Sequence, residues 1–366
     1  MRDRKATAAT TFFRLGSMLA GLKRVPGGLM IIPLMIGALL STLDRAHLEP
    51  IQQALRWLGA PPVESADGVE RYEFLQIGGF ATALTGVGAT TLIAMFLVCV
   101  AAQMNFSVGR DAVKKGAIIT AVKLLVAIGC GYALAVTSDP FHGWLGLSLV
   151  AVIAAMSNGN GGLYLALTGQ YGTRSDVGAV SVISLNDGPF FTLLALGILG
   201  ESFPLAAFLG VLLPMALGFT IGQFSEEARR FLAPGEKLCI PFFAFALGTT
   251  MNFSVFLDAN VVAGGMILGI ATVVLTGSAC ALALRVAGER SVIAGLAEAS
   301  TAGNAVQTPL AVAIAAGLAA SSTPGLGNPY LAIVPIATAQ ISISVIVTAI
   351  LCPAVVALSD SRTDRP

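Results

Sequence analysis

Two short polar segments interrupt long apolar runs of this chain, and both could bind a small charged ligand. Residues 157–162 read Ser-Asn-Gly-Asn-Gly-Gly, and residues 298–304 read Glu-Ala-Ser-Thr-Ala-Gly-Asn, with Gln307 and Pro309 following. Glycine costs about 1 kcal/mol and proline about 3 kcal/mol inside a helix, so we expect both segments to unwind. The N–H groups at a helix N-terminus suit a carboxylate, whereas freed carbonyls with Asn, Ser and Thr oxygens suit a small cation.

The polar side chains of these segments are the candidate substrate ligands. Glycines in membrane helices also permit close packing, which is the alternative role of each segment. Two interruptions at corresponding places in the chain favour a function in binding. The predicted substrate-binding residues, with one further asparagine from a neighbouring apolar run, are Asn158, Asn160, Asn186, Ser300, Thr301 and Asn304.

Three ionisable residues lie within apolar runs: Lys123, Asp187 and Glu298. Counted from the starts of their runs, which we expect on the same side of the membrane, the three residues lie at comparable depth in the bilayer. An unpaired charge at the bilayer centre costs about 2.5–3.5 kcal/mol, so pairing, a proton or a cation must offset it. We predict an ion-coupling role for these three and for Gln307, and a sodium site near Glu298 is one form of that prediction. The alternative is a fixed Lys–carboxylate pair that only stabilises the fold.

The composition indicates an integral membrane protein. Of the 366 residues, 55% are hydrophobic and 11% are charged, whereas soluble domains carry about 25% charged residues. The net charge of +1 argues against nucleic acid as a partner. The 5 cysteines are isolated and the 2 histidines fall between apolar runs, so we predict no zinc site and no organic cofactor.

Apolar runs long enough for a helix of about 20 residues predict ten spans. With the N-terminus in the cytoplasm, 17 of the 21 Lys and Arg residues lie on the inner side and 3 on the outer side. This distribution predicts a multi-pass protein of a bacterial-type cytoplasmic membrane with both termini inside. The spans are expected at about 25–43, 77–102, 113–137, 144–170, 177–200, 203–224, 237–254, 260–287, 291–319 and 329–358.

The chain also repeats itself. Residues 104–108 and 251–255 both read Met-Asn-Phe-Ser-Val, residues 157–160 correspond to 301–304, and Pro33 and Pro214 occupy similar places in their spans. Because each half would hold five spans, the two halves must face opposite ways. The predicted fold is therefore all-α and polytopic, with two inverted five-helix repeats and two discontinuous crossing helices, spans four and nine.

The predicted boundaries follow from this repeat. They are a cytoplasmic N-terminal segment at 1–24, a first repeat at 25–200, a second repeat at 203–358 and a cytoplasmic tail at 359–366. The first repeat contains a long extracytoplasmic connection at 44–76, in which we expect a short interfacial helix.

Several segments resemble the 2-keto-3-deoxygluconate permease family. They include Val-Pro-Gly-Gly-Leu-Met at 25–30, Asn-Gly-Gly-Leu-Tyr at 160–164, Gln-Tyr-Gly-Thr at 170–173 and Ile-Pro-Phe-Phe-Ala-Phe-Ala-Leu-Gly at 240–248. The resemblance implies uptake of this sugar acid by proton symport. It also implies a fold similar to that of the bile acid:sodium symporter superfamily, in which spans one, two, six and seven form a panel against the other six. A glutamate in span nine helps to bind sodium there, and Glu298 occupies a similar place.

The leading hypothesis is thus a symporter that imports a small sugar acid with protons. The alternatives are a sodium-coupled transporter of another organic anion, a channel and an intramembrane enzyme. An enzyme would need a nucleophile with a base, or metal ligands such as a His-Glu-x-x-His run, and the spans contain neither. The expected partners are a small anion and the lipid bilayer, the coupling cation is H⁺ or Na⁺, and the sequence predicts no particular oligomeric state.

Overall fold

A computed structural model describes residues 28–63, 69–104, 109–322 and 327–363. The secondary structure of these residues is helical, and their only β pairing is an isolated bridge between Val63 and Arg71. The predicted all-α class is therefore confirmed. The predicted N-terminal segment 1–24 lies outside the described residues, as do residues 105–108 of the first Met-Asn-Phe-Ser-Val motif.

The number of candidate membrane spans agrees with a multi-pass protein. Eight helices in the described residues are long and apolar enough to cross a membrane, and up to ten spans result when each of two bent helix pairs counts as one. One bent pair joins Arg174–Asn186 to Phe190–Ile198 at an angle of 65°. The apolar run at 177–200 predicts an uninterrupted span here, and the bend corrects that prediction. The bend follows from Gly188, whose φ is +107°, and from Pro189, which cannot continue a helix.

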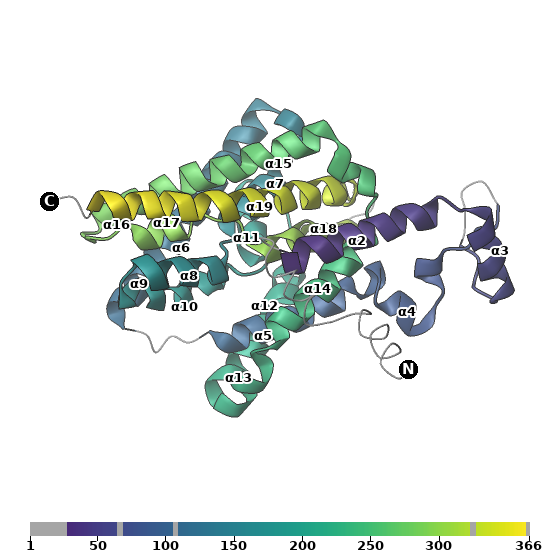
Figure 1. The fold of residues 1–366 in the computed structure, drawn as a ribbon, viewed down its shortest axis with the longest axis horizontal. Coiled ribbons are helices and arrows are strands. Elements are labelled where there is room, and N and C mark those ends of the chain that lie inside the picture. Colours follow the sequence, from purple (N-terminus) through teal and green to yellow (C-terminus); the bar gives the residue numbers. More distant parts are fainter. Residues whose placement is uncertain (1–27, 64–68, 105–108, 323–326, 364–366) are drawn as a thin grey trace, which may run out of the picture.

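One group of helices combines segments from both halves of the chain (Figure 1). Its members pack on one another and are α2 (Gly28–Arg45), α5 (Ala89–Gln103), α12 (Leu205–Phe224) and α14 (Gly235–Gly248). Close packing explains two glycines of α12. A Cβ at Gly218 would overlap the carbonyl oxygen of Val98, and one at Gly222 would overlap that of Ala102. Small residues at such spacing let membrane helices approach closely. These contacts also show that α5 and α12 run in the same direction.

A second group of helices, long and short, surrounds the two interruptions (Figure 1). The long C-terminal helix of this group, α19, packs along α15. The members are α6 (Arg110–Thr137), α7 (Leu149–Ser157), α8 (Gly161–Tyr171), α9 (Arg174–Gly178), α10 (Val180–Ile183), α11 (Phe190–Ile198), α15 (Ala259–Ala271), α16 (Gly277–Val286), α17 (Ile293–Ala297), α18 (Thr308–Ser322) and α19 (Tyr330–Thr363). A π-helical turn at Thr272–Thr276 joins α15 to α16.

Short elements connect these helices. They are α3 (Glu49–Trp57), α4 (Gly79–Ala83), α13 (Glu226–Leu232) and 3₁₀ turns at Phe74–Gln76, Gly86–Gly88, Trp144–Gly146, Ser184–Asn186, Phe253–Leu257 and Gly303–Gln307. The short helix expected within 44–76 is α3. Asp44, near the end of α2, joins the two ends of this connection. Its carboxylate accepts hydrogen bonds from the N–H groups of Phe74 and Leu75 at 2.7 and 3.0 Å.

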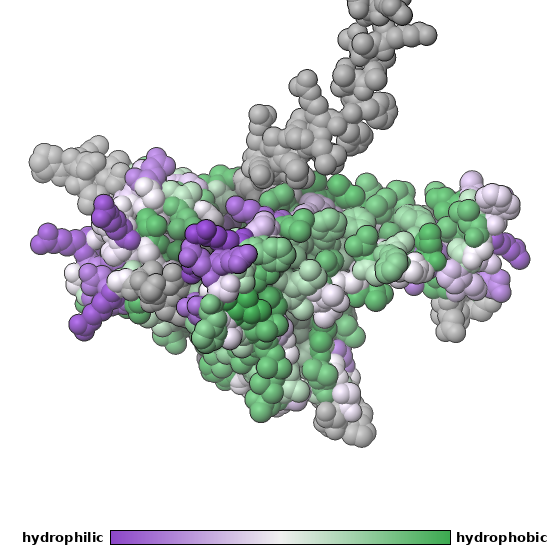
Figure 2. All heavy atoms as spheres, turned by 90° about the horizontal axis from the view of Figure 1, so that it is seen from below, coloured by the Kyte–Doolittle hydropathy of each residue, from purple (hydrophilic) through white to green (hydrophobic). Residues whose placement is uncertain are grey.

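The outer surface suits contact with lipid. Figure 2 shows hydrophobic residues over much of the face that it presents. On α12, Leu205, Leu209, Leu213 and Leu217 recur every four residues, and their exposed fractions range from 42% to 73%. Such a stripe would be unfavourable in water and is stable against acyl chains.

Candidate functional site

The first interruption separates α7 from α8. The helix stops at Ser157, and the extended backbone of Asn158 and Asn160 lets α8 begin at Gly161. The Asn160 side chain caps this new helix, since its Oδ1 accepts a hydrogen bond from the Leu163 N–H at 3.0 Å. The expected unwinding at 157–162 is therefore present, and it leaves an N-terminus of an 11-residue helix inside the protein.

The second interruption separates α17 from the 3₁₀ turn at Gly303–Gln307. Helix α17 ends at Ala297, and the chain then passes through Glu298, Ser300 and Thr301, all of which are buried. The expected unwinding at 298–304 is therefore also present. It frees the carbonyl oxygens of this segment from the regular helical ladder, so they must meet protein, water or ligand.

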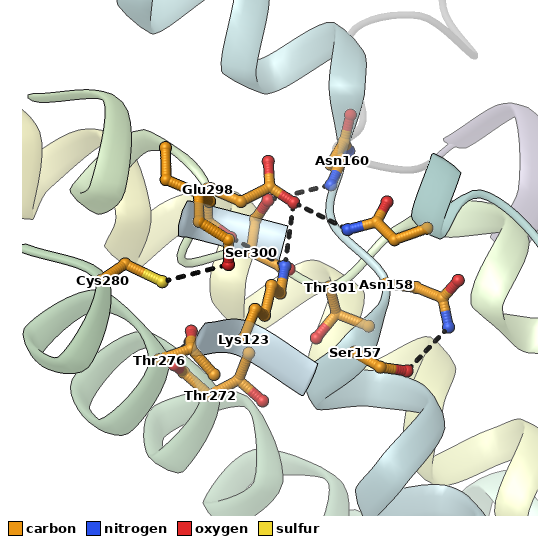
Figure 3. A network of polar contacts seen from close by, with 12 residues as sticks. Lys123, Ser157, Asn158, Asn160, Thr272, Thr276, Cys280, Glu298, Ser300 and Thr301 are labelled. Carbon is orange, nitrogen blue, oxygen red and sulfur yellow. Dashed lines mark hydrogen bonds and ion pairs between the residues drawn. The ribbon is translucent and has the colours of Figure 1, made fainter. Parts of the chain in front are cut away.

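Hydrogen bonds join the two interruptions. The Asn160 N–H donates to Ser300 Oγ at 3.1 Å (Figure 3). The Ala302 N–H donates to the carbonyl oxygen of Asn158 at 3.1 Å. Between these contacts, the backbone of Gly159 lies against the Glu298 carboxylate, where a Cβ would overlap Oε1. The sequence placed the two segments in equivalent positions, and the structure brings them into contact.

A buried charged cluster lies beside this contact. Lys123 of α6 and Glu298 point toward one another (Figure 3), with 3.2 Å between Nζ and Oε1. Asn186 Nδ2 donates to the same carboxylate oxygen at 3.2 Å. The second carboxylate oxygen, Oε2, has no hydrogen-bond partner among the described residues. Lys123 and Glu298 are at most 1% exposed, so each compensates the charge of the other.

Of the other predicted site residues, Asp187 and Asn304 line a cavity, whereas Thr301 and Gln307 do not. Asn304 Nδ2 donates to Asp187 Oδ1 at 3.1 Å, and both residues line the cavity described below. Thr301 is tied to α19, because its Oγ1 lies 2.8 Å from Ser344 Oγ and its N–H donates to Thr348 Oγ1. Gln307 is fully buried, and its amide oxygen and nitrogen have no partner among the described residues.

A cavity of about 710 Å³ lies between the two groups of helices, next to the first interruption. This volume is in the range of small-molecule sites. On the side of the first group it is bounded by the start of α2, the end of α5 and the start of α14. Its polar and charged lining residues are Gln103, Asn160, Ser181, Ser184, Asp187, Lys237 and Asn304.

Three of these lining residues, Ser181, Ser184 and Lys237, are not among the site residues that the sequence predicts. In the sequence, Lys237 is one of the basic residues whose distribution predicts the orientation of the chain. Nothing in its local sequence distinguishes it, since α14 reaches the cavity only through its packing against α2 and α5. Among the described residues that line the cavity, Lys237 is the one cation and Asp187 the one anion.

Comparisons with known proteins point to one family. The family model for 2-keto-3-deoxygluconate permease matches residues 72–365. A relative from Salmonella typhimurium, 2-keto-3-deoxygluconate permease 1, is 43% identical over 333 residues, which cover 91% of this chain and 92% of the relative. A 2-keto-3-deoxygluconate permease from Xanthomonas oryzae is 36% identical, with 94% and 97% covered, and one from Escherichia coli is 32% identical, with 92% of each chain covered. The chain therefore belongs to the 2-keto-3-deoxygluconate permease family and is a membrane transporter, not an enzyme.

Proposed function

We propose that this transporter imports 2-keto-3-deoxygluconate, or a closely similar sugar acid, together with protons. The observation that carries the proposal is the cavity beside the first interruption, where a helix N-terminus and a set of polar side chains lie together. The names of the relatives support this choice of substrate.

The substrate carboxylate would bind at the start of α8. The N–H groups in the first turn of a helix have no partner within that helix, and the helix dipole adds positive potential there. Gly161 and Gly162, which line the cavity, leave this N-terminus uncovered by side chains. Lys237 would add a positive charge on the opposite wall, and Asn160, Ser181 and Ser184 could hydrogen-bond the sugar hydroxyls.

Alternating access would follow from the arrangement of the two groups. We interpret the joined interruptions as the crossing helices of two inverted repeats, with the second group moving past the first. The cavity is lined by the end of α5 and the start of α14, which lie on the side that the basic residues assign to the cytoplasm, and we infer that it opens there. Phe208 lies near the start of α12, on the opposite side of the protein from the ends of α5 and α12. Its ring contacts those of Phe190 and Phe203, with 6.5 Å between the ring centroids in each pair. This aromatic contact would close the outer side.

Coupling would act through Glu298. Its Oε2 atom has no hydrogen-bond partner in the described part of the chain, which leaves it free to receive a proton. Protonation would neutralise the carboxylate and weaken its attraction for Lys123, so the contact between the interruptions could rearrange. A bound proton would thereby favour the movement that carries the substrate.

The test is uptake of radiolabelled 2-keto-3-deoxygluconate by purified protein in proteoliposomes, with a proton gradient or a sodium gradient imposed separately. We expect saturable accumulation with the proton gradient and none with the sodium gradient. Non-saturable equilibration without accumulation would indicate a channel. Failure of the substrate to enter under either gradient, with folded protein, would contradict the proposed substrate.

A further inference from the structure

The ammonium group of Lys123 is held as a bound cation would be held. Its Nζ donates to the carbonyl oxygens of Glu298 and Ser300 at 2.8 and 2.9 Å and to Glu298 Oε1 at 3.2 Å. An ammonium has three N–H donors, and these three oxygens account for all of them. Lys123 reaches this position from α6, outside the interrupted helix (Figure 3).

All three oxygens come from the unwound segment after α17. The carbonyls of Glu298 and Ser300 are available because the helix ends at Ala297. Unwound carbonyls in discontinuous membrane helices, together with a carboxylate, are the oxygen ligands that a transported or coupling cation uses. The second interruption therefore supplies a set of ligands for a small cation, and the lysine ammonium occupies it.

Charge balance points in the same direction. Lys123 and Glu298 are buried, and they supply one positive and one negative charge. A sodium ion beside them would add an uncompensated positive charge at a depth where charges are costly. With Lys123 charged, sodium would lack both its ligands and a counter-charge.

We propose that Lys123 is a tethered cation that fills the cation position of the second interruption and excludes sodium from it. This inference rests on the proposed coupling role of Glu298 and narrows it, because sodium is then excluded from the second interruption and the proton is the ion that can act at Glu298. It gives Lys123 a role beyond that of a structural ion pair.

The experiment replaces the lysine and asks whether sodium can take its place. The wild type, Lys123→Ala, Lys123→Ala/Glu298→Gln and Lys115→Ala are purified in the same lipid nanodiscs. Their thermal unfolding midpoints are measured in NaCl, KCl and choline chloride at equal ionic strength. Lys115 is the matched control, since it is a buried lysine of the same helix whose partners are the side-chain carboxylates of Asp176 and Glu289.

We expect sodium to raise the unfolding midpoint of Lys123→Ala above its value in choline, and potassium to raise it less. The wild type, the double variant and Lys115→Ala should show no sodium-specific shift. A sodium-specific shift in the wild type would overturn the proposal. So would its absence in folded Lys123→Ala, or an equal shift in Lys115→Ala.

If Lys123→Ala does not fold, uptake by the wild type tests the proposal instead. Wild-type uptake driven by a sodium gradient would overturn the exclusion of sodium, whereas proton-driven uptake unaffected by sodium would support it. The unfolding experiment uses no sugar acid, so a wrong substrate would leave its result intact. The failure of this inference and that of the proposed substrate are thereby distinguishable.

Discussion

The Nζ atom of Lys123 lies 3.2 Å from Oε1 of Glu298, although 175 positions separate the two residues in the chain. This ion pair links α6 to the interruption that follows α17. Removing one partner of a buried pair leaves a charge without compensation, which costs more than losing both. Substitutions of Lys123 and Glu298 therefore test separately what the pair contributes to folding stability and what Glu298 contributes to proton coupling.

A double-mutant cycle tests the energetic link between the two residues. Lys123→Met and Glu298→Gln should each lower the free energy of unfolding by about 3–5 kcal/mol, the usual cost of breaking a buried pair. The double variant should lose less than the sum of the two, because no charge is left unpaired. Unfolding of the four proteins in identical nanodiscs measures the cycle, and additive losses would show that the pair is not coupled.

Uptake by Glu298→Gln tests the coupling role directly. The variant should be folded and should not accumulate substrate under a proton gradient, because an amide cannot gain or lose the proton. Exchange of labelled for unlabelled substrate across the membrane should persist, since it needs no change in protonation. Both are measured in proteoliposomes, and accumulation at the wild-type rate would remove Glu298 from the coupling mechanism.

Asn160→Ala tests substrate binding at the start of α8. Loss of the cap and of a hydrogen bond to the substrate should raise KM about tenfold, the effect of about 1.4 kcal/mol. Asn252→Ala is the matched control, since Asn252 Oδ1 also accepts a backbone N–H, that of Ser254 at 2.9 Å, but does not line the cavity. Initial rates over a range of substrate concentrations give KM. Equal changes in the two variants would assign the effect to capping alone.

Gly159→Ala tests the close contact between the interruptions. The new methyl group would overlap the Glu298 carboxylate and push it away from Lys123. Because a flexible side chain can move aside, we expect a larger loss in proton-driven uptake than in thermal stability. Gly169→Ala in α8 is the control, as a Cβ there meets no atom within 4 Å. It should keep its uptake and gain up to about 1 kcal/mol of stability from helix propensity.

Phe208→Ala tests the aromatic closure. Each aromatic pair contributes about 0.5–1.5 kcal/mol beyond its buried area, so losing the contacts with Phe190 and Phe203 should favour opening of that side roughly tenfold. We expect faster efflux of substrate from preloaded proteoliposomes without a gradient. Phe224→Ala, at the other end of α12 and 88% exposed, should leave efflux unchanged. If Phe208→Ala matches the wild type, the closure lies elsewhere.

Some of this could be predicted from residue types alone. Long apolar runs predict membrane helices because backbone groups in lipid must be satisfied within the helix. Asn, Gly and Ser at 157–162 and at 298–304 predict interruptions because these residues weaken a helix locally. Membrane helices and their interruptions both depend on residues that are neighbours in the chain, so the sequence alone is enough to predict them. The inverted relation of the two halves remains a prediction.

Only the tertiary structure decided which groups meet. The sequence placed Lys123, Asp187 and Glu298 at similar depths but could not show that Lys123 pairs with Glu298 while Asn304 donates to Asp187. It also gave no indication that Lys237 lines the cavity. These contacts join residues that are far apart in the chain, and they depend on how whole helices pack. Composition and spacing determine each helix, whereas packing between helices determines the site.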